Sequence, residues 1–370
     1  MHTMMRKTSA GIVAVAAWVG LAGAGLTLEA APAPEPPKPA DMSKPVQVFI
    51  LMGQSNMVGM GKITGGEGSL ENAVKNKGKY RYLVDASGAW VARPDVRFTR
   101  TMQGKGVMVN DWMGIKAGTI GPEFGIAKFV GDATDSPVLI LKCCIGNRSL
   151  GWDLLPPGSK RFEEGGKVYA GYKDSPDSWA VGTEPKPIGW YAGKQYDDDV
   201  GDAKMVLADI GTYYPGAKGY EVAGIFYWQG EKDAGNPVHA AHYEQNLVNL
   251  IAALRKDFNA PNAKFVLGTM GESVKGAGGN GGMVLAGQLA VDGKEGRHPE
   301  FRGNVATVYT HPMAQGGSGN GHYGGNAEVY MDVGEAMGQA MVELLKSGGP
   351  AAKGPKPKPP VGKPKAKVAS

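Results

Sequence analysis

The chain has few cysteines, and their placement excludes a disulfide framework. Cys143 and Cys144 are the only two among 370 residues, and neighbours in sequence seldom reach unstrained disulfide geometry. Both follow an apolar run at 138–141. We therefore expect buried thiols and not a redox pair or a metal site.

The body of the chain also lacks an excess of positive charge. The formal net charge is +5, but the residues after Gly349 carry six lysines and no acidic residue, which leaves −1 for the rest. Prolines alternate with these lysines, so we expect residues 347–370 to form an extended, disordered tail. This pattern argues against a folded nucleic-acid-binding module, although adhesion of the tail to an anionic surface stays open.

Apart from its N-terminus, the chain has no apolar run long enough to span a membrane. Residues 1–30 have the layout of a secretory signal, in which Arg6 and Lys7 precede an apolar stretch at 11–28 and small-residue cleavage sites follow. We therefore expect export to the periplasm or the extracellular space, with no integral membrane span after signal removal. A retained membrane anchor is the alternative, because the stretch is of borderline length.

Glycine is abundant, at 58 residues, but has no three-residue period. A collagen-like structure is therefore excluded, and long loops between regular elements are predicted. Gly276, Gly278 and Gly281 match a dinucleotide-binding fingerprint by letter. Chance matches are expected at this glycine content and no helix clearly follows, so we interpret the stretch as a flexible loop.

Five short apolar runs predict buried strands, and helical patterns lie between them. Strands that alternate with helices imply a parallel sheet covered on both faces. We therefore expect an α/β fold, a three-layer α/β/α sandwich with a mainly parallel five-stranded sheet. The domain should cover 46–346, after a proline-rich linker at 31–45. The expected strands are 46–52, 137–142, 222–228, 264–268 and 304–309, and the expected helices are 123–130, 202–210, 239–258 and 327–345.

Ser55 lies on a tight turn where the first strand passes into a predicted helix. Backbone N–H groups at such a helix start can stabilise an oxyanion, although a serine there is by default only a helix cap. A serine nucleophile needs a neighbouring base. His311 and His322 both follow the fifth strand, at the edge of the sheet where ligands bind in such folds, and either is a candidate base.

The residues around Ser55 resemble a known family. FILMGQSNM at 49–57 is similar to the first block of the SGNH hydrolases, specifically of the sialate O-acetylesterase and acetylxylan esterase group of carbohydrate esterases. Five blocks in the right order are a much stronger signal than one motif. The resemblance implies a flavodoxin-like SGNH fold, with Ser55 as nucleophile and His322 as base. The other four blocks are GPE at 121–123, IGNRSL at 145–150, WQGEKD at 228–233 and GHY at 321–323.

The resemblance also implies which groups bind the oxyanion and the substrate. The oxyanion donors would be the backbone N–H of Ser55 and of a residue near Gly121 or Gly146, with the side chain of Gln229. Gln54 and Asn147 belong to the same blocks and are expected to line the site.

The acid of the triad departs from the family pattern. Many SGNH enzymes place an aspartate three residues before the catalytic histidine, where this chain has Gly319. Either a backbone carbonyl orients His322 in a Ser–His dyad, or an acid reaches in from another loop. Asp233 and Glu231 are preferred to Glu123, because they follow a strand on the same face of the sheet.

Other candidate groups have simpler interpretations. His239 and His242 lie three residues apart on a predicted helix, but a solvated helix face explains them better than a metal site. Trp152, Trp190 and Tyr191 lie in a long segment between the second and third strands. They are candidates for stacking on sugar rings or for core packing, and segments of this length are usually functional or disordered.

Together these features predict an exported serine esterase that removes O-acetyl groups from carbohydrates, sialate or xylan-like, by Ser–His acyl transfer. The expected partner is an acetylated carbohydrate, and no cofactor, metal or nucleic acid is implied. Two alternatives stay open. One is an esterase for non-sugar esters, and the other is a non-catalytic carbohydrate-binding protein, which the glycine at position 319 would explain. Nothing in the sequence specifies an oligomeric state.

Overall fold

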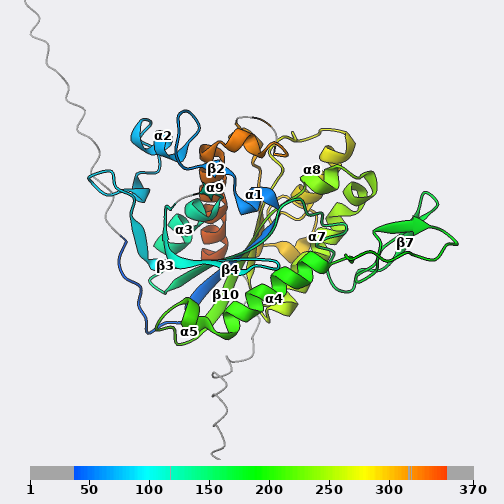
Figure 1. Cartoon of the computed structure of the whole chain (residues 1–370), viewed down its shortest axis with the longest axis horizontal. Helices are drawn as coiled ribbons and strands as arrows, with labels where there is room; N and C mark the ends of the chain where they lie inside the picture. The colour runs from blue at the N-terminus through cyan, green and yellow to red at the C-terminus, as the bar shows by residue number, and fades with distance from the viewer. Residues whose placement is uncertain (1–36, 117, 316, 318, 348–370) are drawn as a thin grey trace, which may run out of the picture. The chain divides into compact units, whose positions relative to one another are not determined.

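A seven-stranded sheet forms the centre of the protein, which a computed structural model describes over residues 37–347 except 117, 316 and 318 (Figure 1). These residues belong to the compact unit that begins at Pro34. The expected signal, residues 31–36 of the linker and all of the tail except Ser347 lie outside them. The strands are β1 (Val46–Gly53), β3 (Ala92–Met102), β4 (Gly106–Gly114), β6 (Val138–Cys143), β10 (Tyr220–Trp228), β11 (Lys264–Gly268) and β12 (Val305–Val308).

The strand order is β12-β11-β10-β1-β6-β3-β4. All neighbouring strands are parallel except β3 and β4, which pair antiparallel. The α/β fold with a mainly parallel sheet is therefore confirmed. The register places Gly53 beside Trp228 and Trp228 beside Gly268, so β1, β10 and β11 end at the same edge.

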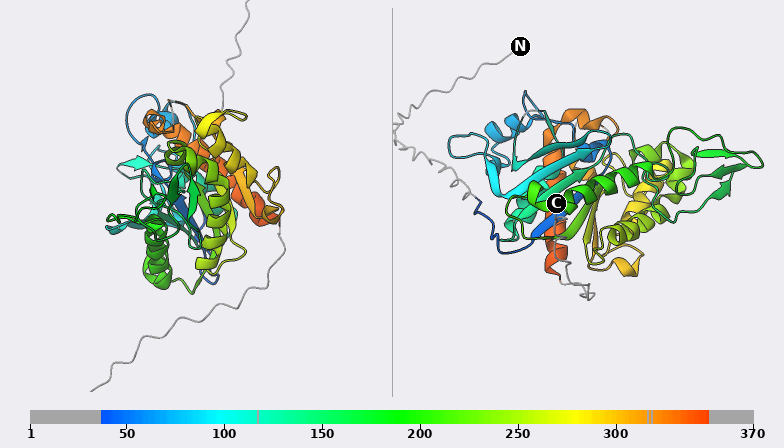
Figure 2. Two further views of the ribbon diagram at one scale, coloured as in Figure 1. Left: turned by 90° about the vertical axis from the view of Figure 1, so that its right-hand side faces the viewer. Right: turned by 60° about the horizontal axis from the view of Figure 1, so that its bottom comes forward.

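Helices cover both faces of the sheet, as the three-layer prediction requires (Figures 1 and 2). Successive side chains of β1 alternate between two core clusters, with Val48 and Ile50 in one and Phe49 and Leu51 in the other. The first cluster includes α4 (Lys194–Ala208), α7 (Pro237–Asp257) and α8 (Gly279–Ala290). The second includes α2 (Leu70–Lys75), α3 (Glu123–Asp132) and α9 (Ala327–Lys346).

The sheet has two more strands than the five that the sequence predicts. In β3, charged and hydroxyl side chains interrupt any apolar run, and Arg93 pairs with Asp95 at 2.6 Å. The glycine-rich stretch after Gly276 also differs from its interpretation as a loop, which is wrong from Gly279 onward. Helix α8 forms there because Val284 and Leu285 are buried and Gly287 packs closely on the α7 backbone.

The long segment between β6 and α4 folds into a small antiparallel sheet of its own, which extends beside α7 (Figure 1). It consists of β7 (Phe162–Glu164), β8 (Lys167–Tyr169) and β9 (Ser178–Ala180).

None of the helices in the described part of the chain has the length and apolar character needed to cross a membrane. The short elements are α1 (Ser55–Val58), β2 (Gly61–Lys62), β5 (Thr119–Ile120), α5 (Ile210–Tyr213), α6 (Glu231–Ala234) and the 3-10 turns η1 (Arg81–Leu83), η2 (Pro299–Phe301), η3 (His311–Met313) and η4 (His322–Gly325).

Candidate active site

The turn between β1 and α1 presents Ser55 at the carboxyl edge of the sheet. Gly53 has a φ of +143°, and a Cβ at this position would lie 2.2 Å from the carbonyl oxygen of Trp228. Only glycine fits such an approach. The next residue, Gln54, donates its backbone N–H to the same carbonyl at 3.1 Å. Ser55 is half-buried and lines a cavity of about 820 Å³.

The turn that precedes α9 brings His322 to the same cavity. His322 has a φ of +52° and donates its backbone N–H to the carbonyl of Gly319 at 3.0 Å. The other candidate base, His311, donates Nδ1–H to the carbonyl of Gly271 at 2.7 Å and is not among the described residues that line the cavity. The structure therefore brings together Ser55 and His322, which lie near opposite ends of the folded region.

Glu231 lies buried between the two turns. Its carboxylate accepts hydrogen bonds from Nδ2 of Asn56, at 2.7 Å, and from Nε2 of Gln54. Nδ2 of Asn56 also donates to the carbonyl of Gly319 at 3.0 Å. Burial, and then the nearby charge of Glu272, raise the pKa of Glu231 to about 7. Glu231 thus supports both turns through Asn56.

Gly319 lies where the family pattern has an aspartate, and two carboxylates from elsewhere surround it. A Cβ at Gly319 would lie 2.5 Å from Glu272 and 2.6 Å from Glu231. Glu272 also accepts the backbone N–H of Gly319 at 3.0 Å. Glu272 was not predicted from the sequence, although it follows β11 at the edge of the sheet where the site lies. Among the described carboxylates, none forms a hydrogen bond or ion pair with the imidazole of His322.

Asp233 supports the glycine loop that follows β6. Its carboxylate accepts the backbone N–H groups of Leu150 and Gly151, both at 2.8 Å. Gln229 lies next to it, fully buried, and donates Nε2–H to Asp233 at 2.5 Å and to the carbonyl of Arg148 at 2.9 Å. Both N–H bonds of the Gln229 amide are therefore engaged beneath the loop, and its role as an oxyanion donor stays a prediction.

Gly146 and Asn147, on the glycine loop, both line the cavity. A Cβ at Gly146 would lie 3.4 Å from Cβ of Ser55, so its backbone is close to the nucleophile. Gly121 lies beneath α1 instead, and its N–H donates to Glu123 at 3.1 Å. The carboxylate of Glu123 in turn forms an ion pair with the buried Lys142 at 2.6 Å.

His239 differs from its interpretation as part of a solvated helix face. Its side chain is only 9% exposed, and Nε2 lies 3.2 Å from Oδ1 of Asp177. The segment that follows β6 packs onto α7 here, because a Cβ at Gly151 would lie 2.5 Å from the His239 ring. Burial lowers the pKa of His239, but the hydrogen bond to Asp177 and the charge of Asp233 raise it overall. Both His239 and Trp152 line the cavity.

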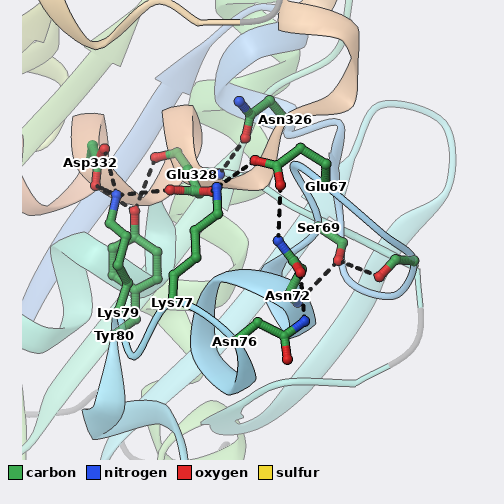
Figure 3. A network of polar contacts seen from close by, with 11 residues as sticks. Glu67, Ser69, Asn72, Asn76, Lys77, Lys79, Tyr80, Asn326, Glu328 and Asp332 are labelled. Carbon is green, nitrogen blue, oxygen red and sulfur yellow. Dashed lines mark hydrogen bonds and ion pairs between the residues drawn. The ribbon is translucent and has the colours of Figure 1, made fainter.

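A polar network fixes the start of α9, directly after the His322 turn (Figure 3). The side chain of Asn326 caps the helix by accepting the N–H of Glu328 at 3.0 Å. Glu328 accepts from Lys77 at 2.6 Å and from Lys79 at 3.0 Å, and Lys79 also reaches Asp332 at 3.1 Å (Figure 3). Lys77 and Lys79, from one segment far away in the sequence, thus hold the helix whose preceding turn carries His322.

One comparison with known protein families gives a match over most of the chain. A family model described as "Carbohydrate esterase, sialic acid-specific acetylesterase" matches residues 45–343. No curated protein matches the chain.

Three solved structures are similar to this chain at low identity. A protein of Arabidopsis thaliana is 18% identical with a TM-score of 0.46, and the match covers 81% of this chain and 98% of that one. A carbohydrate acetylesterase from Xanthomonas citri is 13% identical with a TM-score of 0.48, over 81% of this chain and 56% of that one. NanS is 15% identical with a TM-score of 0.45, over 82% of this chain and 99% of that one.

Proposed function

Because the chain belongs to the family of sialic acid-specific acetylesterases among the carbohydrate esterases, we propose that it is an exported serine esterase that removes O-acetyl groups from a carbohydrate. The observation that carries the proposal is that Ser55 and His322 line one cavity. Sialate and xylan-like glycans are the substrate classes that we propose. Export rests on the signal-like residues 1–30, and the N-terminal sequence of the mature protein tests it.

The proposed reaction is acyl transfer through Ser55. The hydroxyl oxygen of Ser55 attacks the acetyl carbonyl carbon while His322 accepts the hydroxyl proton. The backbone N–H groups of Ser55 and Gly146 stabilise the negative charge that develops on the carbonyl oxygen. His322 then donates the proton to the departing sugar oxygen, and water, activated by the same imidazole, hydrolyses the acetyl-enzyme.

We assign a Ser–His dyad to this reaction. Three candidate acids have other partners: Glu231 accepts from Asn56, Asp233 accepts from the glycine loop, and Glu123 pairs with Lys142. Glu231 acts as a positioning residue in this proposal, because Asn56 connects it to the carbonyl of Gly319, which also accepts the N–H of His322.

Replacement of the two catalytic groups tests the proposal. We expect Ser55→Ala and His322→Ala each to lower kcat for aryl acetate by about 10⁴-fold or more, because the dyad acts as a unit. His311→Ala is the matched control and should retain activity within about tenfold, since its ring is held on Gly271 away from Ser55. Unchanged acetate release by Ser55→Ala, or fluorophosphonate labelling of another residue, would refute the assignment.

Two further measurements separate the alternatives. An esterase for non-sugar esters would cleave aryl acetate but leave acetylated xylan and O-acetyl sialosides intact. A carbohydrate-binding protein without turnover would bind the glycan and never release acetate, with the wild-type chain as inert as Ser55→Ala.

A further inference from the structure

A second cavity of about 160 Å³ adjoins the one that contains Ser55 and His322. Asp177 and His239 line both cavities, so this pair is their common boundary. The two side chains are in direct contact, with Nε2 of His239 lying 3.2 Å from Oδ1 of Asp177. Asp177 keeps 38% of its side chain exposed, and its carboxylate can therefore accept a hydrogen bond from a ligand that crosses the boundary.

Aromatic side chains form one wall of the second cavity. Phe162 and Tyr169 are partners on β7 and β8, and their rings stack with centroids 5.2 Å apart and planes 10° from parallel. The imidazole of His242 lies against the Phe162 ring at 4.2 Å. The apolar CH groups of a sugar ring pack well on such a surface, and binding sites for small molecules are generally lined in this way.

Neutral polar groups complete the lining. Gln245, Asn246 and Asn249 contribute amides from successive turns of α7, and an amide can both donate to and accept from a sugar hydroxyl. Ser159 lines the same cavity, and its hydroxyl oxygen has no hydrogen-bond partner in the described part of the chain. A ligand hydroxyl would satisfy it, which is favourable because a buried unpaired polar group is costly.

The charges that face the cavity are largely compensated. His239 pairs with Asp177, and Nε2 of His242 lies 3.1 Å from Glu164. Lys160 is exposed and has no carboxylate partner among the described residues. The volume equals that of about five water molecules in the liquid, enough for one sugar ring. Size, aromatic wall and amide groups thus suit a neutral polyhydroxylated ring.

From this lining we infer that the second cavity is a subsite for a sugar unit neighbouring the acetylated one, so that the substrate is an oligosaccharide or polysaccharide and not a free monosaccharide. The inference rests on the proposed esterase function and specifies its substrate class. Gly151 permits the arrangement, because a Cβ there would lie 2.5 Å from the His239 ring and would displace it from the boundary.

Chain-length dependence tests the inference. The probes are O-acetylated xylo-oligosaccharides and O-acetylated sialyl oligosaccharides of one to four units, with 4-nitrophenyl acetate as the reference ester. For wild-type protein we expect kcat/KM to rise at least tenfold between one unit and two or three. Tyr169→Ala and the double change Asn246→Ala with Asn249→Ala should each reduce the ratio of oligosaccharide to aryl acetate kcat/KM by at least tenfold.

Matched control variants distinguish a loss of substrate binding in the cavity from a general effect on folding. Tyr220→Ala changes a 39% exposed tyrosine at the amino end of β10, and Gln339→Ala changes an exposed amide on α9. Both should keep the wild-type ratio. Asn246 and Asn249 lie on α7 and outside the small sheet, so we expect their replacement to report on the subsite even if Tyr169→Ala disturbs β8.

Each result is decisive for one of the two proposals. Acetate release that does not depend on chain length, or wild-type ratios in both sets of variants, would overturn the subsite. No acetate release from any probe by the wild-type chain would contradict the esterase function instead. Calorimetry of unacetylated xylotriose, whose rings are neutral, with Ser55→Ala protein tests the subsite separately. Binding by this protein and loss of binding after the Asn246 and Asn249 changes would support the subsite, and absence of binding would oppose it.

Discussion

Gly319 lies at the point where the carboxylates of Glu231 and Glu272 approach one another. Neither carboxylate leaves room for a side chain there, since a Cβ would lie within 2.6 Å of both. Both carboxylates accept the hydrogen bonds that such polar groups need inside a protein, Glu231 from Asn56 and Glu272 from the backbone N–H of Gly319. Asn56 also donates to the carbonyl of Gly319. At the scale of the residue, the missing aspartate therefore reflects a site in which Glu231 and Glu272, acids that follow β10 and β11 in the chain, hold the histidine turn.

Glu231 should make stability depend on pH between about 4.5 and 7. Its pKa is about 7 in the folded protein, against 4.5 as its ordinary value. The folded state therefore binds the proton more tightly than the unfolded state does. This difference adds up to about 3 kcal/mol to the free energy of unfolding at low pH, and the addition is lost as pH rises through this window. Glu231→Gln removes the titrating group. Its amide NH₂ would then face the NH₂ group of Gln54 or Asn56, which donates to Glu231 in the wild-type protein, and a buried donor without an acceptor costs about 1–3 kcal/mol.

Urea unfolding at pH 5 and pH 8 measures this effect. We expect Glu231→Gln to be clearly less stable than wild type at pH 5, and the difference to shrink at pH 8. Glu343→Gln, an exposed change on α9, is the control and should leave the pH dependence as it is. Parallel curves for wild type and Glu231→Gln would show that Glu231 does not titrate in this range.

Single residues were predictable where a motif specifies them. The order of the five blocks predicts that Ser55 and His322 meet, and both line one cavity. The roles of Asp233 and Gln229 were not predictable, because their hydrogen bonds depend on where the loop at Leu150 folds back. Glu272 belongs to none of the five blocks, and only the register of β11 brings it to Gly319.

At the scale of elements, all five strands with continuous apolar runs were predictable. Such runs are typical of strands buried on both faces of a parallel sheet. The strands missed are β3 and β4 at one side of the sheet and the two- and three-residue strands β2, β5, β7, β8 and β9. Polar side chains interrupt the pattern in β3 and β4, and the others are too short to show one. Helix α4 begins at Lys194, so the predicted start at 202 is wrong. The three aspartates at 197–199 interrupt the apolar pattern by which the first turns of the helix could have been predicted.

A buried ion pair connects the element that carries the nucleophile to the neighbouring helix. Nζ of Lys142, on β6, donates to Glu123 at 2.6 Å and to the carbonyl of Val58, at the end of α1, at 3.0 Å. Glu123 accepts the N–H of Gly121. Lys142→Met leaves a buried carboxylate without its cation, which should destabilise the fold by about 3–5 kcal/mol.

A double-mutant cycle with Glu123→Gln measures the coupling. We expect the double variant to be more stable than the sum of the single losses predicts, because it contains no uncompensated buried charge. Aryl acetate kcat should fall in Lys142→Met, since the end of α1 loses its anchor. Additive losses in free energy would contradict a direct interaction between the two side chains.

At the scale of the whole folded unit, glycine determines how closely the layers approach. The abundance of glycine predicts long loops, but Gly125 in α3 and Gly334 and Gly338 in α9 lie inside helices that pack together. A Cβ at Gly334 would lie 2.2 Å from the carbonyl oxygen of Pro122. Composition alone cannot distinguish such contacts from loops, because they depend on which helix faces meet.

Two glycine-to-alanine changes in helix interiors should therefore have opposite effects. Gly334→Ala forces α9 away from Pro122, and overpacking of this kind costs about 1–3 kcal/mol. Gly201→Ala, in α4, meets no atom within 4 Å and should stabilise the protein by about 0.5–1 kcal/mol through helix propensity and reduced unfolded-state entropy. Urea unfolding of both variants measures the difference. Because α9 follows the His322 turn and Pro122 follows Gly121, only Gly334→Ala should also lower kcat for aryl acetate. Equal free energies of unfolding for the two variants would refute close packing of α3 and α9.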